Sequence, residues 1–136
     1  MKHAILITHG LIGQAIIDAV RSILGVDDGL HALSVTDMSL TEITQRLLAI
    51  INSPDVRQDG VMILASLKGG SCWNVAAAIA KDHHHVRVIS GINLPMALSF
   101  MTKRDLLPLE DLADVLVKDG ARSVVKLEKS QPFLQR

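Results

Sequence analysis

Short apolar runs of strand length alternate with longer amphipathic segments along this chain, and Gly, Pro, Asn or Asp marks each change. The first run, His3–Thr8, reads HAILIT, and apolar residues then recur at spacings of three and four over residues 11–24. Strands that are separated by single helices must run parallel, because only a crossover returns the chain to the same edge of a sheet. The pattern therefore predicts an α/β fold in which helices cover the strands of a parallel sheet.

The other elements are expected to follow the same alternation. Strands are predicted over residues 31–35, 60–65 and 86–90, and helices over 40–52, 72–81, 96–100 or beyond, and 110–118. Thr36, Asp37 and Ser39 are candidate caps for the second helix. Residues 53–55 are expected to end that helix, and Gly120 to stop the last helix. Residues 123–127 (SVVKL) are open to interpretation as a fifth strand, followed by a polar tail over 128–136.

Composition limits the kind of protein that this chain can be. Its 136 residues suffice for a single domain, 1–136, with one hydrophobic core. Lys and Arg number 14, as do Asp and Glu, so the chain lacks the basic excess of nucleic-acid-binding domains and membrane-surface helices. It has one Cys, no charged-then-apolar leader and no apolar run of about 18 residues. We therefore expect a cytoplasmic protein.

The carboxyl ends of the predicted strands are where chemistry is expected, because ligands of open α/β sheets bind beyond those ends, where the strand order reverses. The first strand ends in Thr8-His9-Gly10, directly before a helix. The imidazole of His9 can act as a base, a metal ligand or a phosphoryl acceptor, and the free N–H groups of the next helix favour an anion beside it. The alternative is a histidine that only caps the turn.

The third strand is followed by a glycine-rich loop, Ser66-Leu67-Lys68-Gly69-Gly70-Ser71, which opens another helix. The N–H groups at Gly69 and Gly70, the charge of Lys68 and the hydroxyl of Ser71 would together form a cradle for an oxyanion. The loop has neither the GxxxxGK(S/T) spacing of a P-loop nor the GxGxxG of a dinucleotide turn, so no nucleotide cofactor is indicated. A tight turn is the alternative interpretation of the glycine pair.

Three further features carry weaker hypotheses. The fourth strand is followed by the loop GINLPM at residues 91–96, where Asn93 most simply caps a helix. Three consecutive histidines at 83–85 invite a metal interpretation, but consecutive side chains diverge and no Cys or carboxylate repeats nearby at ligand spacing, so a solvated loop is favoured. Cys72 has no adjacent base in the sequence and is expected to be a small buried thiol.

Three segments, taken together and in this order, resemble the mannose-type (mannose, fructose and sorbose) enzyme IIA domains of the bacterial phosphotransferase system. They are THG at residues 8–10, GGSCWN at 69–74 and GINLPM at 91–96, and the resemblance covers almost the whole chain. It implies a doubly wound, mainly parallel open sheet with helices on both faces. It also implies a homodimer in which a final antiparallel strand, here residues 123–127, is exchanged between subunits.

The resemblance assigns His9 as a phosphoryl acceptor. A phosphohistidine there would be formed from phospho-HPr and passed to a sugar-specific enzyme IIB, with no cofactor or metal, and with a membrane involved only through a permease complex. Hydrogen-bond donors around the phosphoryl group would spread its charge in a loose transition state. The residues expected to support it are Thr8, Gly10, Ser66, Lys68, Gly69, Gly70, Ser71 and Asn93.

This chain departs from the family pattern at three places. Ser66 stands where family members place an Asp that orients the active histidine, and a Ser cannot offset the charge of an imidazolium. Lys68 replaces an apolar or aromatic residue and brings a cation that could compensate electrostatically. Cys72-Trp73 replaces a Pro-aromatic pair and so loses the stiff start of the helix.

Two other functions stay open at this point. A regulatory protein of the phosphotransferase system would be phosphorylated on His9 without serving sugar transport, and the Ser66 departure favours it. A module that binds a small anion or metabolite non-covalently would use the same loops. The related phosphocarrier of dihydroxyacetone kinase is disfavoured, because its first motif has Ser where this chain has Gly10.

Overall fold

Four parallel strands form a single open sheet in a computed structural model of the chain, which describes residues 1–129. The strands are β1 (His3–Thr8), β2 (Leu30–Ser34), β3 (Val61–Ala65) and β4 (Val86–Ser90), and their order across the sheet is β2-β1-β3-β4. The chain moves outward from β1 to β2 on one side and from β3 to β4 on the other, so the strand order reverses between β1 and β3. The predicted doubly wound parallel sheet is confirmed.

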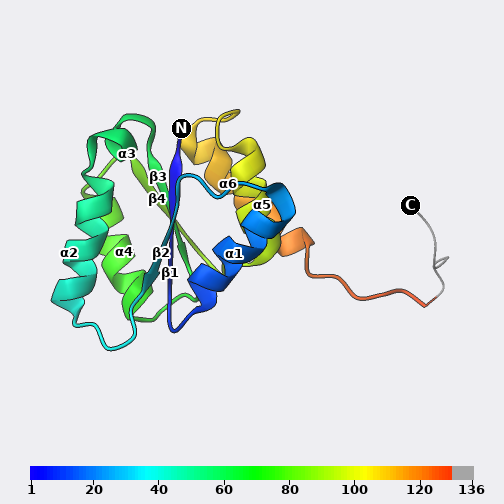
Figure 1. Cartoon of the computed structure of the whole chain (residues 1–136), viewed down its shortest axis with the longest axis horizontal. Coiled ribbons are helices and arrows are strands. Elements are labelled where there is room, and N and C mark those ends of the chain that lie inside the picture. The colour runs from blue at the N-terminus through cyan, green and yellow to red at the C-terminus, as the bar shows by residue number, and fades with distance from the viewer. Residues whose placement is uncertain (130–136) are drawn as a thin grey trace.

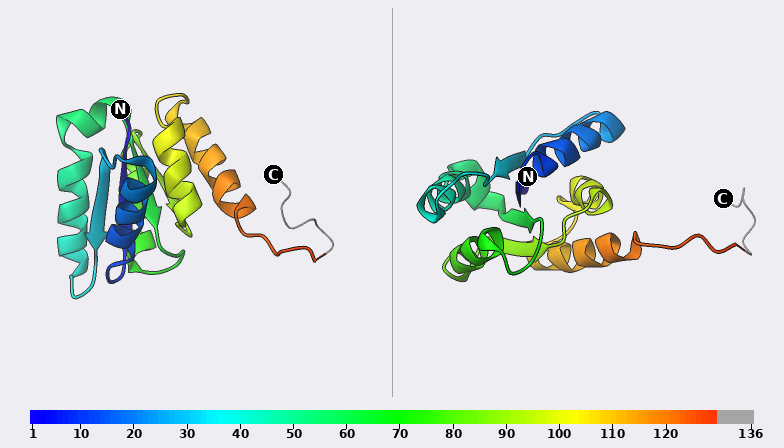
Figure 2. Two further views of the ribbon diagram at one scale, coloured as in Figure 1. Left: turned by 45° about the vertical axis from the view of Figure 1, so that its right-hand side comes forward. Right: turned by 90° about the horizontal axis from the view of Figure 1, so that it is seen from below.

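Helices of the described part of the chain cover the sheet from both sides (Figure 1). One layer consists of α2 (Leu40–Ile51), α3 (Pro54–Asp59) and α4 (Ser71–Lys81). The other consists of α1 (Ile12–Leu24), α5 (Leu94–Lys103) and α6 (Leu109–Arg122). Figure 2 shows these helices from two further directions. Each layer buries its own hydrophobic core against the sheet.

The two central strands have no polar face. Alternate side chains of a strand point to opposite sides of the sheet. Ile5 and Ile63 accordingly join the core beneath α2 and α4, while Leu6 and Leu64 join the core beneath α1, α5 and α6. Strands that are buried on both faces read as continuous apolar runs, which is why HAILIT and VMILA stand out in the sequence.

Of two predictions about helix boundaries, one is confirmed and one is wrong. The helix α2 ends before residues 53–55, as expected, but these residues also begin the short helix α3. Pro54 is the first residue of α3, where its fixed φ and missing N–H are well suited. Gly120 does not stop the last helix, which continues to Arg122. A Cβ at Gly120 would lie 2.8 Å from Met96 Cε, so this glycine leaves room for the end of a side chain from α5.

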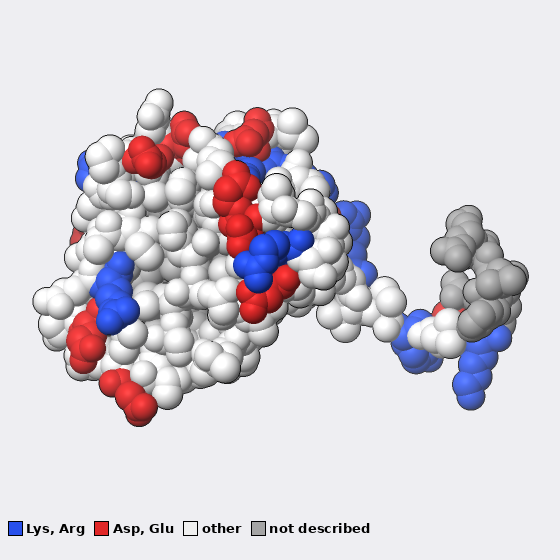
Figure 3. All heavy atoms as spheres, viewed as in Figure 1, with Lys and Arg blue, Asp and Glu red and all other residues white. Residues whose placement is uncertain are grey.

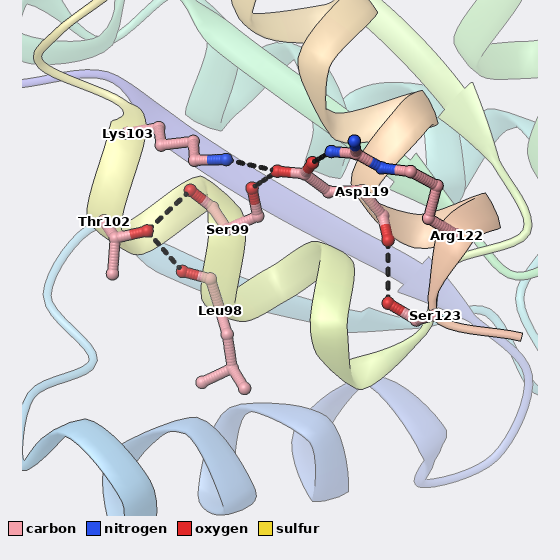
Figure 4. A network of polar contacts seen from close by, with 7 residues as sticks. All are labelled: Leu98, Ser99, Thr102, Lys103, Asp119, Arg122 and Ser123. Carbon is pink, nitrogen blue, oxygen red and sulfur yellow. Dashed lines mark hydrogen bonds and ion pairs between the residues drawn. The ribbon is translucent and has the colours of Figure 1, made fainter. Parts of the chain in front are cut away.

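Asp119 fastens α6 to α5 through its carboxylate (Figure 4). It accepts hydrogen bonds from Lys103 Nζ at 2.5 Å, from Arg122 Nη2 at 2.6 Å and from the Ser99 hydroxyl. The bond from Lys103, with those from Ser99 and Arg122, holds the pKa of the Asp119 carboxyl far below its usual range. The carboxylate therefore stays ionised across the neutral pH range and ties the two helices together.

The segment after α6 includes most of residues 123–127, which the sequence allows to be interpreted as a fifth strand. Residues 124–128 have no secondary structure in this single chain and lead away from the body of the molecule (Figures 1 and 2). Val124 is 80 % exposed, Val125 82 % and Leu127 74 %. The segment thus presents apolar side chains that the rest of the described chain does not cover. Of the predicted polar tail, residues 130–136 lie outside the described part.

Candidate functional site

The predicted loops meet at the carboxyl edge of the sheet, tied by main-chain hydrogen bonds just beyond the strand ends. Ser66 N, after β3, donates to Ile7 O of β1 at 3.1 Å. Ile92 N, after β4, donates to Ala65 O of β3 at 3.1 Å. The loops that follow β1, β3 and β4 are therefore neighbours, and the first two flank the point where the strand order reverses.

His9 follows β1 and is exposed at this edge. The chain turns sharply after it, because Gly10 has a φ of +58°, a left-handed conformation that glycine adopts readily. Helix α1 begins two residues later, at Ile12. The imidazole is thus carried on a short connection between a buried strand and a helix, and it is open to a reactant from solvent.

Thr8 supports this connection from within. It is 1 % exposed, and its Oγ1 accepts a hydrogen bond at 3.0 Å from Gly13 N, in the first turn of α1. A Cβ at Gly13 would lie 3.2 Å from that oxygen and 3.2 Å from Leu6 O, so α1 approaches β1 closely. Thr8 therefore positions the start of α1, and with it the loop that carries His9.

Ser66 lies at the end of β3, next to the end of β1 that carries His9. Its Oγ is buried and has no hydrogen-bond partner among residues 1–129. Buried hydroxyls are almost always paired, so an unpaired one beside a candidate site needs an explanation. This hydroxyl keeps the capacity to donate one hydrogen bond and to accept others.

The glycine-rich loop leads into the N-terminus of α4, which no side chain caps. Gly69 has a φ of +89°, and Gly70 is the N-cap residue. The N–H groups of the first turn, that of Ser71 among them, have no acceptor within the helix and attract an anion. Lys68 is exposed, and no carboxylate of residues 1–129 forms an ion pair with it. These are the features of an oxyanion cradle.

Asn93, like Thr8, is a predicted site residue whose side chain is already hydrogen-bonded within the fold. Its Oδ1 accepts a hydrogen bond from Met96 N at 2.9 Å, which caps α5. Its Nδ2 donates to Gly120 O of α6 at 3.1 Å. The capping interpretation is confirmed, and Asn93 acts on this edge by shaping the loop after β4.

The side chains of Cys72, His83 and His85 are buried or contact the main chain. Cys72 is 2 % exposed, as expected, and burial raises the pKa of its thiol. His83 Nδ1 lies 2.8 Å from Ile79 O, and His85 Nε2 lies 3.0 Å from Ile51 O. His85 is 7 % exposed, so the prediction of a solvated loop is wrong for it. Residues 1–129 contain no group of three or more His, Cys, Asp or Glu side chains suited to a metal ion.

Thr36 belongs to this edge although the sequence suggests it only as a cap for α2. Its Oγ1 accepts a hydrogen bond from Gly10 N at 2.8 Å. Ser39 caps α2 instead, in a capping box with Glu42. The contact joins the loops after β1 and β2, which are neighbours only in the folded sheet. The signal available in the sequence is the place of Thr36, almost directly after a predicted strand.

The surface charges are mixed on the face seen in Figure 3, where acidic and basic side chains intermingle between wide uncharged areas. That distribution agrees with the balance of 14 basic and 14 acidic residues in the sequence. None of the helices within residues 1–129 has the length and apolar character to cross a membrane.

Comparison with known families gives a match over most of the chain. The EIIA-man family model, described as the PTS system fructose IIA component, matches residues 3–117. The chain belongs to this family. The sorbose-specific EIIA component of Klebsiella pneumoniae is 31 % identical over 116 residues, which cover 85 % of this chain and 84 % of that protein. The mannose-specific EIIAB component of Escherichia coli is 30 % identical over 128 residues, which cover 92 % of this chain but 39 % of that protein.

Solved structures of EIIA proteins have the same fold. The mannose/sorbose-specific IIA subunit from Enterococcus faecalis gives a TM-score of 0.80 at 27 % identity, over 99 % of this chain and 100 % of that one. The EIIA component from Streptococcus agalactiae gives 0.83 at 22 % identity, over 93 % and 97 %. The predicted resemblance is confirmed, and the chain is a mannose-type EIIA component of the phosphotransferase system.

Proposed function

We propose that this EIIA component is a phosphoryl carrier, in which His9 accepts a phosphoryl group from phospho-HPr and passes it to an enzyme IIB. The observation that carries the proposal is the position of His9, exposed on the loop after β1 and beside the point where the strand order reverses. A carrier histidine has to be reached by two protein partners in turn and needs no nucleotide pocket. Membership of the EIIA-man family supports the same assignment.

The proposed step exchanges one bond to phosphorus for another. The lone pair of a neutral ring nitrogen of His9 forms the new P–N bond, while the bond from phosphorus to its donor breaks and the electron pair leaves with HPr. The ring then carries a positive charge until a nucleophile of enzyme IIB bonds to the phosphorus and the P–N bond breaks, which returns the electron pair to the ring. In a loose transition state much negative charge lies on the phosphoryl oxygens, so donors around them lower the barrier.

The loop after β3 supplies those donors in this proposal. The free N–H groups at the N-terminus of α4, beside Gly69 and Gly70, and the hydroxyl of Ser71 bind the phosphoryl oxygens. Lys68 adds a positive charge that no carboxylate of residues 1–129 neutralises through an ion pair. The unpaired hydroxyl of Ser66 finds its partner in the imidazole or in the phosphoryl group.

Apolar side chains near His9 suit contact with protein partners. Leu11 is 80 % exposed, Ile12 52 % and Leu67 56 %, and they lie on the loops after β1 and β3 or at the first residue of α1. Exposed apolar surface next to a reactive group is typical of an interaction site. We further propose that the protein works in the cytoplasm, as a homodimer in which the exposed segment 124–128 contacts the second subunit.

Transfer from HPr tests the carrier function. Wild-type protein, His9→Ala and a matched control, His84→Ala, which changes an exposed histidine away from this edge, are incubated with phosphoenolpyruvate, enzyme I and HPr. Wild type and the control should gain the mass of one phosphoryl group that is lost in acid, and His9→Ala should gain none. A folded wild-type protein that gains nothing from active HPr would refute the proposal.

Ser66 favours a second candidate, a regulatory protein that is phosphorylated on His9 without feeding a sugar permease. A hydroxyl at this position cannot offset the imidazolium charge that forms during transfer. Adding purified enzyme IIB to the phosphorylated protein separates the two functions, because a carrier loses its phosphoryl group to IIB and a regulator keeps it. Absence of covalent modification, together with saturable binding of inorganic phosphate, would instead indicate an anion-binding module.

A further inference from the structure

The turn after β2 holds the His9 segment on both sides. Val35 N donates a hydrogen bond to Thr8 O at 3.0 Å, just before His9. Thr36 Oγ1 accepts one from Gly10 N at 2.8 Å, just after His9. Two successive residues of one loop therefore fix the residues that flank the histidine, while the histidine itself stays exposed.

The turn that presents Thr36 has an unusual backbone. Met38 N donates to Val35 O at 3.1 Å, which closes a four-residue turn with Thr36 and Asp37 at its centre. Asp37 has a φ of +61°, a left-handed conformation that few residues other than glycine adopt, although Asp is among those that tolerate it. The conformation of Asp37 thus belongs to a turn in which the hydroxyl of Thr36 reaches the amide of Gly10.

The hydroxyl of Thr36 is available to donate a hydrogen bond. A threonine hydroxyl can accept two hydrogen bonds and donate one. Gly10 N uses one acceptor site, and the other polar neighbour of this oxygen within residues 1–129 is Ser34 Oγ, at a long 3.4 Å. Thr36 is exposed to solvent on the loop beside His9, so its O–H can turn toward a group carried by that histidine.

We propose that Thr36 is a further residue of the phosphoryl site, where its oxygen fixes the amide of Gly10 and its proton binds an oxygen of the phosphoryl group on His9. This inference rests on the carrier function proposed above. It adds a donor from the loop after β2 to those from the loop after β3, so the phosphoryl group is bound from both sides of β1. No bond of Thr36 is made or broken in the transfer.

Two variants of Thr36 and one control test the inference. Thr36→Val keeps the shape and removes the hydroxyl, Thr36→Ser keeps the hydroxyl, and Thr41→Val makes the same change at an exposed threonine of α2. We measure the initial rate of phosphorylation by phospho-HPr and the hydrolysis rate of the phosphorylated protein. Thr36→Val should be phosphorylated about tenfold more slowly, since an oxyanion donor is lost, and should lose its phosphoryl group faster. Thr36→Ser and Thr41→Val should stay within about twofold of wild type.

The outcomes separate this inference from the carrier function itself. Wild-type rates and lifetimes in a folded Thr36→Val would overturn the role of Thr36 while leaving the carrier function standing. A Thr36→Ser variant as slow as Thr36→Val would also overturn it, because the loss would then come from the missing methyl group and its packing. A wild-type protein that accepts no phosphoryl group would overturn both proposals.

Discussion

His3 Nδ1 and His31 Nε2 lie 2.9 Å apart, and the two rings stack with centroids 5.2 Å apart and planes inclined by 16°. The pair joins β1 to β2 toward the amino end of the sheet, away from the edge that carries His9. One ring must donate an N–H and the other must accept it, so at least one ring is neutral. Burial lowers the pKa of both histidines, with help from the N-terminal amine and Arg104 at His3 and from His3 at His31. Asp55 and Asp59 oppose this shift at His3.

We predict that this pair makes the fold less stable as the pH falls from about 7 to about 5. The pKa values of both rings are lower in the folded chain than the ordinary value of 6.5, so the unfolded chain binds more protons in that range. His31→Gln, which does not titrate there, should show a flatter pH dependence of the free energy of unfolding, and His84→Gln should follow wild type. Urea titrations at several pH values measure the slopes, and equal slopes for wild type and His31→Gln would contradict the prediction.

A methyl group at Gly120 is predicted to displace the end of the Met96 side chain. Ala there would place its Cβ 2.8 Å from Met96 Cε. Overpacking costs about 1–3 kcal/mol, and the helix propensity of Ala returns only about 1 kcal/mol. We expect Gly120→Ala to lower the free energy of unfolding by about 1 kcal/mol in urea titrations. In a Met96→Ala background the same change should be nearly neutral, whereas an equal cost in both backgrounds would exclude this contact as the cause.

The exposed segment after α6 is predicted to hold the dimer. A chain cut after Ser123 keeps α6 whole through Arg122 and removes Val124, Val125 and Leu127. Light scattering should give a dimer for the full chain and a monomer for this truncation. A chain cut after Glu128 keeps the segment and should stay dimeric. A soluble dimer from the shorter chain would show that another surface joins the subunits.

A carboxylate at position 66 is predicted to speed phosphoryl transfer. Ser66→Asp would place a negative charge beside His9, and stabilising the imidazolium by one pKa unit corresponds to a factor of about ten. We therefore expect phosphorylation by HPr to become about tenfold faster than in wild type. Ser66→Asn, which is similar in size and uncharged, is the matched control. If the Asp variant is no faster than the Asn variant, charge at position 66 does not govern the rate.

The strands and the positions of their ends can be predicted from local sequence. Runs such as VMILA are apolar on both faces, and the residue after such a run has to lie at the edge of the sheet. The edge position of His9 and the neighbouring glycine loop follow from that pattern. The apolar pattern does not predict the short helix α3, because Pro54 both ends one helix pattern and starts the next element.

Contacts between distant segments cannot be predicted from local sequence. Gly120 has the appearance of a helix stop, and only the close approach of Met96 from α5 explains a glycine inside α6. The bond between Thr36 and Gly10 likewise depends on the pairing of β1 with β2. His85 is buried, and a nitrogen of its ring lies within hydrogen-bond distance of Ile51 O, 34 residues away in the chain.

The position of the phosphoryl group tests the central claim most directly. Wild-type protein is phosphorylated through HPr, digested with trypsin at alkaline pH, where phosphohistidine survives, and sequenced by tandem mass spectrometry. Cleavage after Lys2 and Arg21 gives a peptide with two histidines, so fragmentation has to distinguish His9 from His3. We expect the phosphoryl group on His9. Its presence on His3 or on the histidines at 83–85, or its absence from every peptide, would contradict the account.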